Sequence, residues 1–130
     1  MSGDTASKTL YDLLGGIEGV RKLVHEFYRI MDSNPGYSVI RNLHPKELKT
    51  SEEKLVLFLT GWSGGPPVYV QKYGHPRLKA RHLPFAIGNE ERDQWLSCMK
   101  EAIAVTIERE QVRDILYQAL EPVADFMRNK

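Results

Sequence analysis

The spacing of apolar residues is the most constraining feature of this chain of 130 residues. It follows three- and four-residue steps, which place apolar side chains on one face of an α-helix. The clearest case spans residues 17–31, where the apolar positions are Ile17, Val20, Leu23, Val24, Phe27, Tyr28 and Met31. Only VYVQKY, residues 68–73, resembles a strand, and a lone strand has no partner with which to pair. The pattern therefore predicts an all-α protein.

Start signals predict three further long helices. Thr50 with Glu53 three residues later is typical of a capping box, and the residues that follow are apolar on almost every side, which indicates deep burial. Asn89, followed by two glutamates, predicts the start of the next helix, and the last begins near Glu110. We expect the first eight residues and the polar tail after Phe126 to be mobile.

Composition narrows the class of protein. The formal net charge of +1 gives no reason to expect nucleic acid or an anionic membrane as a partner. With a single cysteine, Cys98, the chain forms no internal disulfide, which fits a reducing compartment. No stretch approaches the roughly 20 apolar residues of a membrane span, and the N-terminus lacks the pattern of a signal peptide. We therefore expect one cytoplasmic domain, residues 1–130.

Two of the four histidines lie in GHPRLKARHLPF, residues 74–85. His75 precedes Pro76 and is expected to shape the loop. His82 falls at the end of a short helix that Pro84 terminates, where the helix dipole alone favours a histidine. No cluster of Cys, His, Asp or Glu has the spacing of a zinc site. If His82 binds a metal, it is therefore a solitary ligand, as in haem proteins, where iron needs one axial imidazole in a large apolar slot.

The chain contains apolar residues for the wall of such a slot and cations for the propionates at its mouth. The wall candidates are Leu55, Phe58, Leu59, Phe85, Ile87, Trp95 and Met99. The cation candidates are Lys54, Lys79 and Arg81. On these residues alone a second interpretation stays open, namely a plain helical bundle whose aromatic residues are simply core. In either case His25 is expected to face solvent and Cys98 to be a small buried hydrophobe.

Five segments, taken in order, resemble the truncated haemoglobins, and specifically their group II. These are the glycine pair 15–16, EFYRIM, EEKLVLFLTGWSGGPPVY, GHPRLKARHLPF and ERDQWLSCM. The pattern GHPRL-x-x-RH-x-PF, with Trp95 thirteen positions after His82, is highly specific. The resemblance implies a truncated globin fold, a two-on-two helical sandwich around haem b, in which the proximal helix is reduced to a single turn.

Carried over residue by residue, the resemblance also implies roles within the site. His82 matches the proximal iron ligand, with its Nδ1–H donated to a backbone carbonyl near Leu78. Trp95, Tyr28 and His44 match the polar residues that stabilise the gas ligand. Ser51 matches the gate to the distal side, which Leu55 and Phe58 line, and Arg81 resembles a propionate partner. No residue is assigned with certainty to catalysis.

The expected function is reversible binding of oxygen and other diatomic ligands, CO and NO, with tight oxygen binding. That property suits a redox or detoxification role, such as NO dioxygenation or peroxide chemistry, better than bulk oxygen transport. An enzymatic role is left open, and it would need an external electron donor or reductase. A histidine at position 44 further predicts that ligand release depends on pH near neutrality. The alternative is a haem-free helical interaction module that retains the fold.

Overall fold

The computed structural model describes residues 8–130, and over that range it is helical, with no strand. The elements are α2 (Leu10–Leu13), α3 (Gly16–Ser33), the 3-10 helix η1 (Pro35–Tyr37), α4 (Ser38–Arg41), α5 (Lys49–Trp62), α6 (Val68–Tyr73), α7 (Leu78–His82), α8 (Asn89–Thr106) and α9 (Glu110–Phe126). The all-α prediction is confirmed for these residues. The expectation of mobility for residues 1–7 lies outside the described residues.

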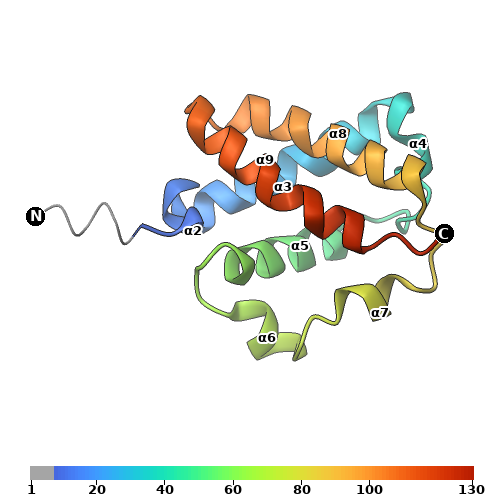
Figure 1. Ribbon diagram of the computed structural model, residues 1–130, viewed down its shortest axis with the longest axis horizontal. Helices are drawn as coiled ribbons and strands as arrows, with labels where there is room; N and C mark the ends of the chain where they lie inside the picture. The colour runs from blue at the N-terminus through green and yellow to red at the C-terminus, as the bar shows by residue number, and fades with distance from the viewer. Residues whose placement is uncertain (1–7) are drawn as a thin grey trace, which may run out of the picture.

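Two pairs of helices form the body of the molecule (Figure 1). Helix α3 contacts both α5 and α8, and α9 lies against α8. In Figure 1, α8 and α9 form the upper half, while α5, α6 and α7 form the lower half. The pair α3–α5 therefore stacks on the pair α8–α9, and α6 and α7 continue from the α5 side.

Helix α3 supplies the centre of the hydrophobic core. Its buried residues are Val20, Leu23, Val24, Phe27, Tyr28, Ile30 and Met31. This is the face that the sequence predicts, with Ile30 added and Ile17 only partly buried. Complete burial of a side chain such as Leu23 or Phe27 stabilises the fold by about 1.5–3 kcal/mol. The core thus continues through α3 into α5, α8 and α9.

The predicted helix caps at Thr50 and Asn89 are wrong. Helix α5 begins at Lys49, and its cap is Leu48, two residues before Thr50, without a side-chain hydrogen bond. At α8 the cap is Gly88, whose backbone N–H donates to Oε1 of Glu91 at 2.8 Å. Because the carboxylate of Glu91 reaches back across the first turn, the helix start does not need the side chain of Asn89.

The connections depend on glycine at two points. Gly15 has φ +94° at the junction of α2 and α3, and Gly64 has φ +105° after α5, a conformation that other residues rarely adopt. Near these turns the backbone N–H of Tyr11 donates to the carbonyl of Ser63 at 2.8 Å. The short helix α2 is thereby tied to the end of α5. Residues 68–73, the one candidate strand, form helix α6.

Candidate functional site

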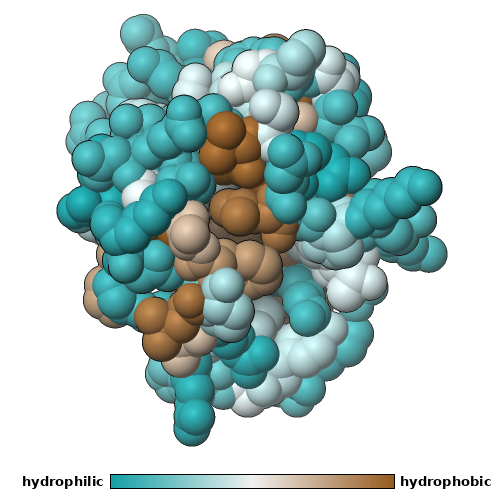
Figure 2. All heavy atoms as spheres, turned by 90° about the vertical axis from the view of Figure 1, so that its right-hand side faces the viewer, coloured by the Kyte–Doolittle hydropathy of each residue, from teal (hydrophilic) through white to brown (hydrophobic). Residues whose placement is uncertain are grey.

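A cavity of about 550 Å³ lies between the two halves of the fold, within the range of about 300–1,000 Å³ typical of small-molecule sites. Its lining is mainly apolar and comes from both helix pairs, from α6 and α7, and from the segments that flank α4 and α8. The lining residues are Tyr28, Ile40, Leu43, His44, Pro45, Ser51, Lys54, Leu55, Phe58, Leu59, Tyr69, Arg81, His82, Phe85, Ile87, Glu91, Arg92, Trp95, Leu120, Val123, Ala124 and Met127. Figure 2 shows apolar residues gathered in the middle of the right-hand face of Figure 1, within a polar surround.

The structure brings together all of the predicted site residues except Met99 and the cation candidate Lys79, whose amine instead donates to the carbonyls of Phe126 and Arg128. Met99 does not line the cavity. Its side chain is completely buried in the hydrophobic core with α3 and α5 residues. The prediction that Met99 forms part of the wall is therefore not supported, although Trp95, one turn earlier on α8, does line the cavity.

Three polar side chains meet at the α3 side of the cavity and are held by one another and by Phe27. The ring of Phe27 lies edge-on to the rings of Tyr28 and Trp95, with centroid distances of 5.0 and 5.3 Å. The ring of Tyr28 in turn lies edge-on to the imidazole of His44 at 5.6 Å. Phe27 was predicted only as core, yet its contacts fix the orientation of two polar residues that face the cavity.

The polar atoms of Tyr28 and Trp95 form few hydrogen bonds with the described residues. The hydroxyl of Tyr28 has only a long contact of 3.5 Å to the carbonyl of Ser51, and burial raises its pKa well above the usual value, so it stays protonated. Among residues 8–130 the indole N–H of Trp95 has no hydrogen-bond partner. The indole of Trp95 can only donate a hydrogen bond, whereas the hydroxyl of Tyr28 can donate or accept one. Both groups are therefore available to a molecule in the cavity.

A hydrogen bond to the backbone of Ile40, four residues earlier, fixes His44 in one tautomer. Its Nδ1 lies 2.8 Å from the carbonyl of Ile40, so Nδ1 carries the proton and Nε2 is the acceptor in the neutral ring. Burial lowers the pKa of His44 below its usual 6.5, the hydrogen bond to Ile40 opposes that shift, and the charges of Arg41 and His82 add to it. The imidazole is therefore neutral at neutral pH, and the predicted change of charge moves to a more acidic range.

His82 ends the short helix α7 and lines the cavity together with Phe85 and Ile87. Its carbonyl accepts from the backbone N–H of Phe85 at 3.0 Å. His75 lies outside the cavity lining, and its Nδ1 accepts from the backbone N–H of Arg77 at 3.1 Å, as expected of a residue that shapes the loop. Donation from Nδ1 of His82 to a carbonyl near Leu78 stays a prediction.

Charged groups at the cavity differ in how far they are already paired. Arg92 is bound to Asp93 and Asp125, and the carboxylate of Glu91 accepts from the backbone of Gly88. By contrast, Arg81 is exposed and, within residues 8–130, forms no ion pair. Lys54 is also exposed, with its amine 5.5 Å from the ring centre of Tyr73. These two cations are placed to meet an anionic group at the mouth of the cavity.

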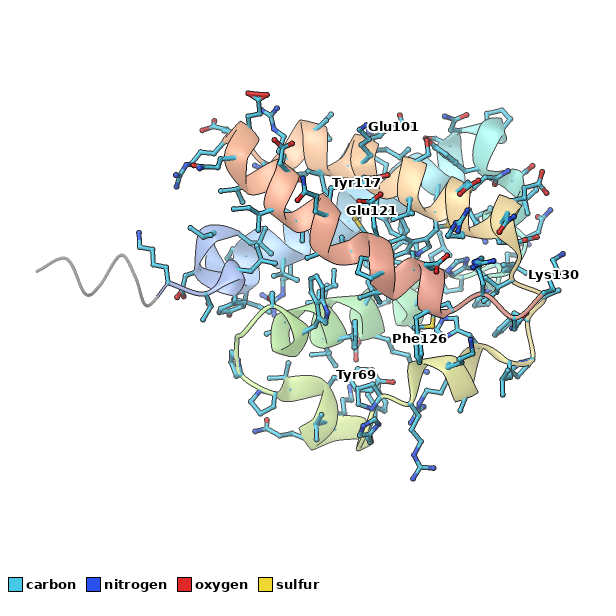
Figure 3. All side chains as sticks on the ribbon, in the orientation of Figure 1. Tyr69, Glu101, Tyr117, Glu121, Phe126 and Lys130 are labelled. Atoms are coloured by element: carbon cyan, nitrogen blue, oxygen red, sulfur yellow. The ribbon has the colours of Figure 1, made fainter. Side chains whose placement is uncertain are left out.

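Sequence reasoning missed the part of the lining that comes from α6 and from the C-terminus. Tyr69 on α6 is buried against Phe58, with ring centroids 6.2 Å apart, and Figure 3 shows it in the lower half of the molecule. Leu120, Val123 and Ala124 lie on α9, a helix that the sequence predicted without assigning any of its residues to the site. The signal for this part of the lining was the spacing of Leu120, Val123 and Met127, which lie three and four positions apart.

A second hollow, of about 710 Å³, lies at the surface between α8 and α9. It is lined mostly by charged and polar side chains, including Arg92, Asp93, Lys100 and Glu121. None of the predicted site residues belongs to it. The smaller cavity, with its apolar wall and convergent polar groups, is therefore the candidate site.

Comparison with known proteins decides the family. The model of the bacterial-like globins matches residues 9–129. The chain belongs to the bacterial-like globin family. It is 41% identical to the group 2 truncated haemoglobin YjbI of Bacillus subtilis (strain 168) over 115 residues, which cover 88% of this chain and 85% of that protein. The group II assignment made from the sequence is thereby confirmed.

Solved structures of this globin family confirm the two-on-two fold. The group II 2-on-2 haemoglobin from Agrobacterium tumefaciens superimposes with a TM-score of 0.91 at 45% identity, covering 95% of both chains. The truncated oxygen-avid haemoglobin from Bacillus subtilis gives a TM-score of 0.84 at 40% identity, covering 94% of this chain and all of the other. In this globin, α3–α5 and α8–α9 are the two stacked pairs.

Family membership implies haem as the cofactor and small diatomic gases as ligands. The residues present fit a haem group, since one cavity combines two imidazoles, an apolar wall, two cations without an ion pair within residues 8–130 and an indole N–H without a hydrogen-bond partner in the same range. Within residues 8–130 there is no group of three or more Cys, His, Asp or Glu that could hold a different metal. No helix in the same range is long and apolar enough to cross a membrane.

Proposed function

We propose that this globin holds haem b through Nε2 of His82 and binds oxygen, CO and NO on the side of Tyr28, His44 and Trp95. The observation that carries the proposal is the convergence of the His82 imidazole and of the polar side chains of Tyr28, His44 and Trp95 in one apolar cavity. The imidazoles of His82 and His44 both line this cavity, which supports a site with one on each side of the haem. When bound, haem iron supplies reversible gas binding and one-electron redox chemistry.

The protein's contribution is to set hydrogen-bond donors around the gas ligand. Trp95 donates only, and its indole N–H is not used elsewhere among the described residues. The hydroxyl of Tyr28 can donate to the ligand or to Nε2 of His44, which is an acceptor in the neutral ring. A hydrogen bond to a charged acceptor stabilises it by about 1.5–3 kcal/mol. One such bond therefore slows ligand release roughly tenfold to hundredfold.

Slow release favours redox turnover over oxygen delivery, because a carrier must unload. We infer that the chain serves a detoxification role, NO dioxygenation or peroxide chemistry, with electrons from a separate reductase. The sequence contains no flavin or nicotinamide motif from which the chain could draw electrons itself. The oxygen-avid character of the Bacillus subtilis haemoglobin, to which this chain is similar, supports tight binding.

The decisive test is the absorption spectrum of the haem-reconstituted protein in the ferrous state, with and without CO. We expect a sharp Soret band that shifts on CO binding, and its loss or broadening in His82→Ala. The matched control is His75→Ala, because His75 lies on the same loop but outside the cavity lining. An unchanged spectrum in His82→Ala would move the ligand to another histidine, and no haem uptake by the wild type would leave the haem-free interaction module.

A further inference from the structure

The C-terminal tail is not the mobile segment that the sequence predicts. Its residue Asn129 forms four hydrogen bonds with the segment that joins α7 to α8. The amide Nδ2 donates to the carbonyls of His82 at 3.3 Å and Phe85 at 2.8 Å. The amide Oδ1 accepts from the backbone N–H of Ile87 at 2.9 Å, and the backbone N–H of Asn129 donates to the carbonyl of Ile87 at 2.8 Å. One side chain thus holds both ends of residues 82–87.

Neighbouring residues of the tail fasten it on either side of Asn129. The amine of Lys79, on α7, donates to the carbonyls of Phe126 and Arg128, both at 2.9 Å. It thereby provides a hydrogen-bond donor for the carbonyl of the last residue of α9. The guanidinium of Arg128 contacts Asp125 at 2.8 Å and Asn89 at 3.2 Å. Figure 3 shows Lys130, the next residue, beside the connection between α7 and α8. The tail is therefore bound to both helices that border the segment.

Among the described side chains of α7 and of the residues that follow it, few apolar groups are buried. Lys79, Ala80 and Arg81 are exposed, and Leu83 and Phe85 are 59% and 41% exposed. The helix has five residues, and its N-cap, Arg77, holds a left-handed backbone with φ +45°. Such a residue other than glycine costs of order 1–3 kcal/mol. The position of this turn therefore depends on hydrogen bonds, and those from Asn129 reach the carbonyl of His82 itself.

We propose that Asn129 is a positioning residue for His82, so that the tail sets the orientation of the imidazole in the cavity. The inference rests on the proposed role of His82 as the haem ligand. Bonds to the carbonyls of residues 82 and 85 fix the backbone on which the imidazole is carried, and the pair of bonds to residue 87 fixes the start of α8. Without these hydrogen bonds from Asn129, α7 would shift relative to the cavity, and the bond between the imidazole and haem iron would weaken.

The test compares Asn129→Ala and Asn129→Asp with the wild type in the haem-bound protein. The aspartate keeps an acceptor for the N–H of Ile87 but replaces the donor with a carboxylate oxygen, which the carbonyls of His82 and Phe85 repel. The matched control is Asn34→Ala, because Asn34 also accepts from a backbone N–H, that of Gly36 at 2.8 Å, but lies outside the cavity lining.

Three quantities are measured: the iron–imidazole stretching band by resonance Raman in the ferrous ligand-free protein, haem loss to excess apomyoglobin, and thermal unfolding. We expect both Asn129 variants to broaden and lower the stretching band and to speed haem loss roughly tenfold, while Asn34→Ala changes neither. A lower melting temperature with an unchanged band and unchanged haem loss would overturn the proposal and leave Asn129 a purely structural residue. A wild type without any iron–imidazole band would instead refute the proposed function before a variant is measured.

Discussion

On the α3 side of the cavity, Phe27 and Tyr28 are almost completely buried, at 0% and 6% exposure, and they are surrounded by core residues of α5 and α8. On the α7 side, Leu83 and Phe85 remain largely exposed, and the backbone is held by the C-terminal tail. Apolar burial therefore positions the polar residues on the first side, whereas directional hydrogen bonds position His82 on the second. The two sides should respond differently to substitution.

The largest effect is expected from Phe27→Ala. This change removes a fully buried ring that touches both Tyr28 and Trp95, and Phe→Ala substitutions in cores typically cost about 3–5 kcal/mol. The free energy of unfolding, measured with denaturant, should fall by that amount, and oxygen release should accelerate because two donors lose their support. A loss below about 1 kcal/mol would show that the α3 side does not depend on this ring.

Trp95→Phe should have the next largest effect, and on ligand release rather than on stability. Phenylalanine keeps an aromatic ring beside Phe27 but has no N–H to donate. We expect the oxygen dissociation rate in stopped flow to rise roughly tenfold to hundredfold. The matched control is Trp62→Phe, at a partly buried position that does not line the cavity. Equal dissociation rates in the two variants would assign the main donor to Tyr28 instead.

The difference between the two sides also explains what the sequence could predict. The face of α3 and the wall residues Leu55 and Phe58 follow from helical periodicity, because burial leaves a repeating mark on the sequence. Met99 carried the same mark as Trp95, four positions earlier, but periodicity does not say where along a buried face a cavity ends. Membership of a family supplied the roles of individual residues, which periodicity alone did not.

The tail could not be predicted in the same way. Asn129 contacts residues 42 to 47 positions away through single polar groups, and such contacts have no period and no characteristic spacing. A short polar segment at a chain end is usually mobile, so the prediction followed the general rule. The cap predictions for α5 and α8 failed for a different reason, since Leu48 caps α5 without a side-chain hydrogen bond, and at α8 the carboxylate of Glu91, three residues after Gly88, takes the place of the Asn89 side chain.

His44 provides a smaller and pH-dependent effect on the α3 side. Because burial holds its folded-state pKa below 6.5, the unfolded chain binds more protons as the pH falls below that value, and stability falls with it. The charges of Arg41 and His82 act in the same direction. Between about pH 7.5 and about pH 5, the free energy of unfolding measured with denaturant should fall more steeply in the wild type than in His44→Gln. Parallel pH profiles would mean that His44 titrates normally in the folded protein.

The same titration bears on ligand release. The sequence predicted a change near neutrality, but a lowered pKa keeps the imidazole neutral there, so the oxygen dissociation rate should stay level on the neutral side of pH 6.5 and change only on the acidic side. Protonation at Nε2 converts this atom from an acceptor into a donor. The direction of the change then identifies its partner: slower release indicates donation to the ligand, and faster release indicates that the bond with Tyr28 was the one lost.

The smallest effect on stability is expected from Leu83→Ser, although Leu83 is apolar and directly follows His82 in the sequence. Its side chain is 59% exposed and does not line the cavity, and its backbone N–H still donates to the carbonyl of Ala80 at 3.3 Å after the change. Surface substitutions of this kind usually alter stability by less than about 0.5 kcal/mol. A loss near that of a core residue would show that apolar burial also holds the α7 side, and the contrast with Phe27→Ala would then disappear. If stability and haem retention both stay unchanged, the position of His82 depends on the hydrogen bonds of its backbone rather than on the apolar residue next to it.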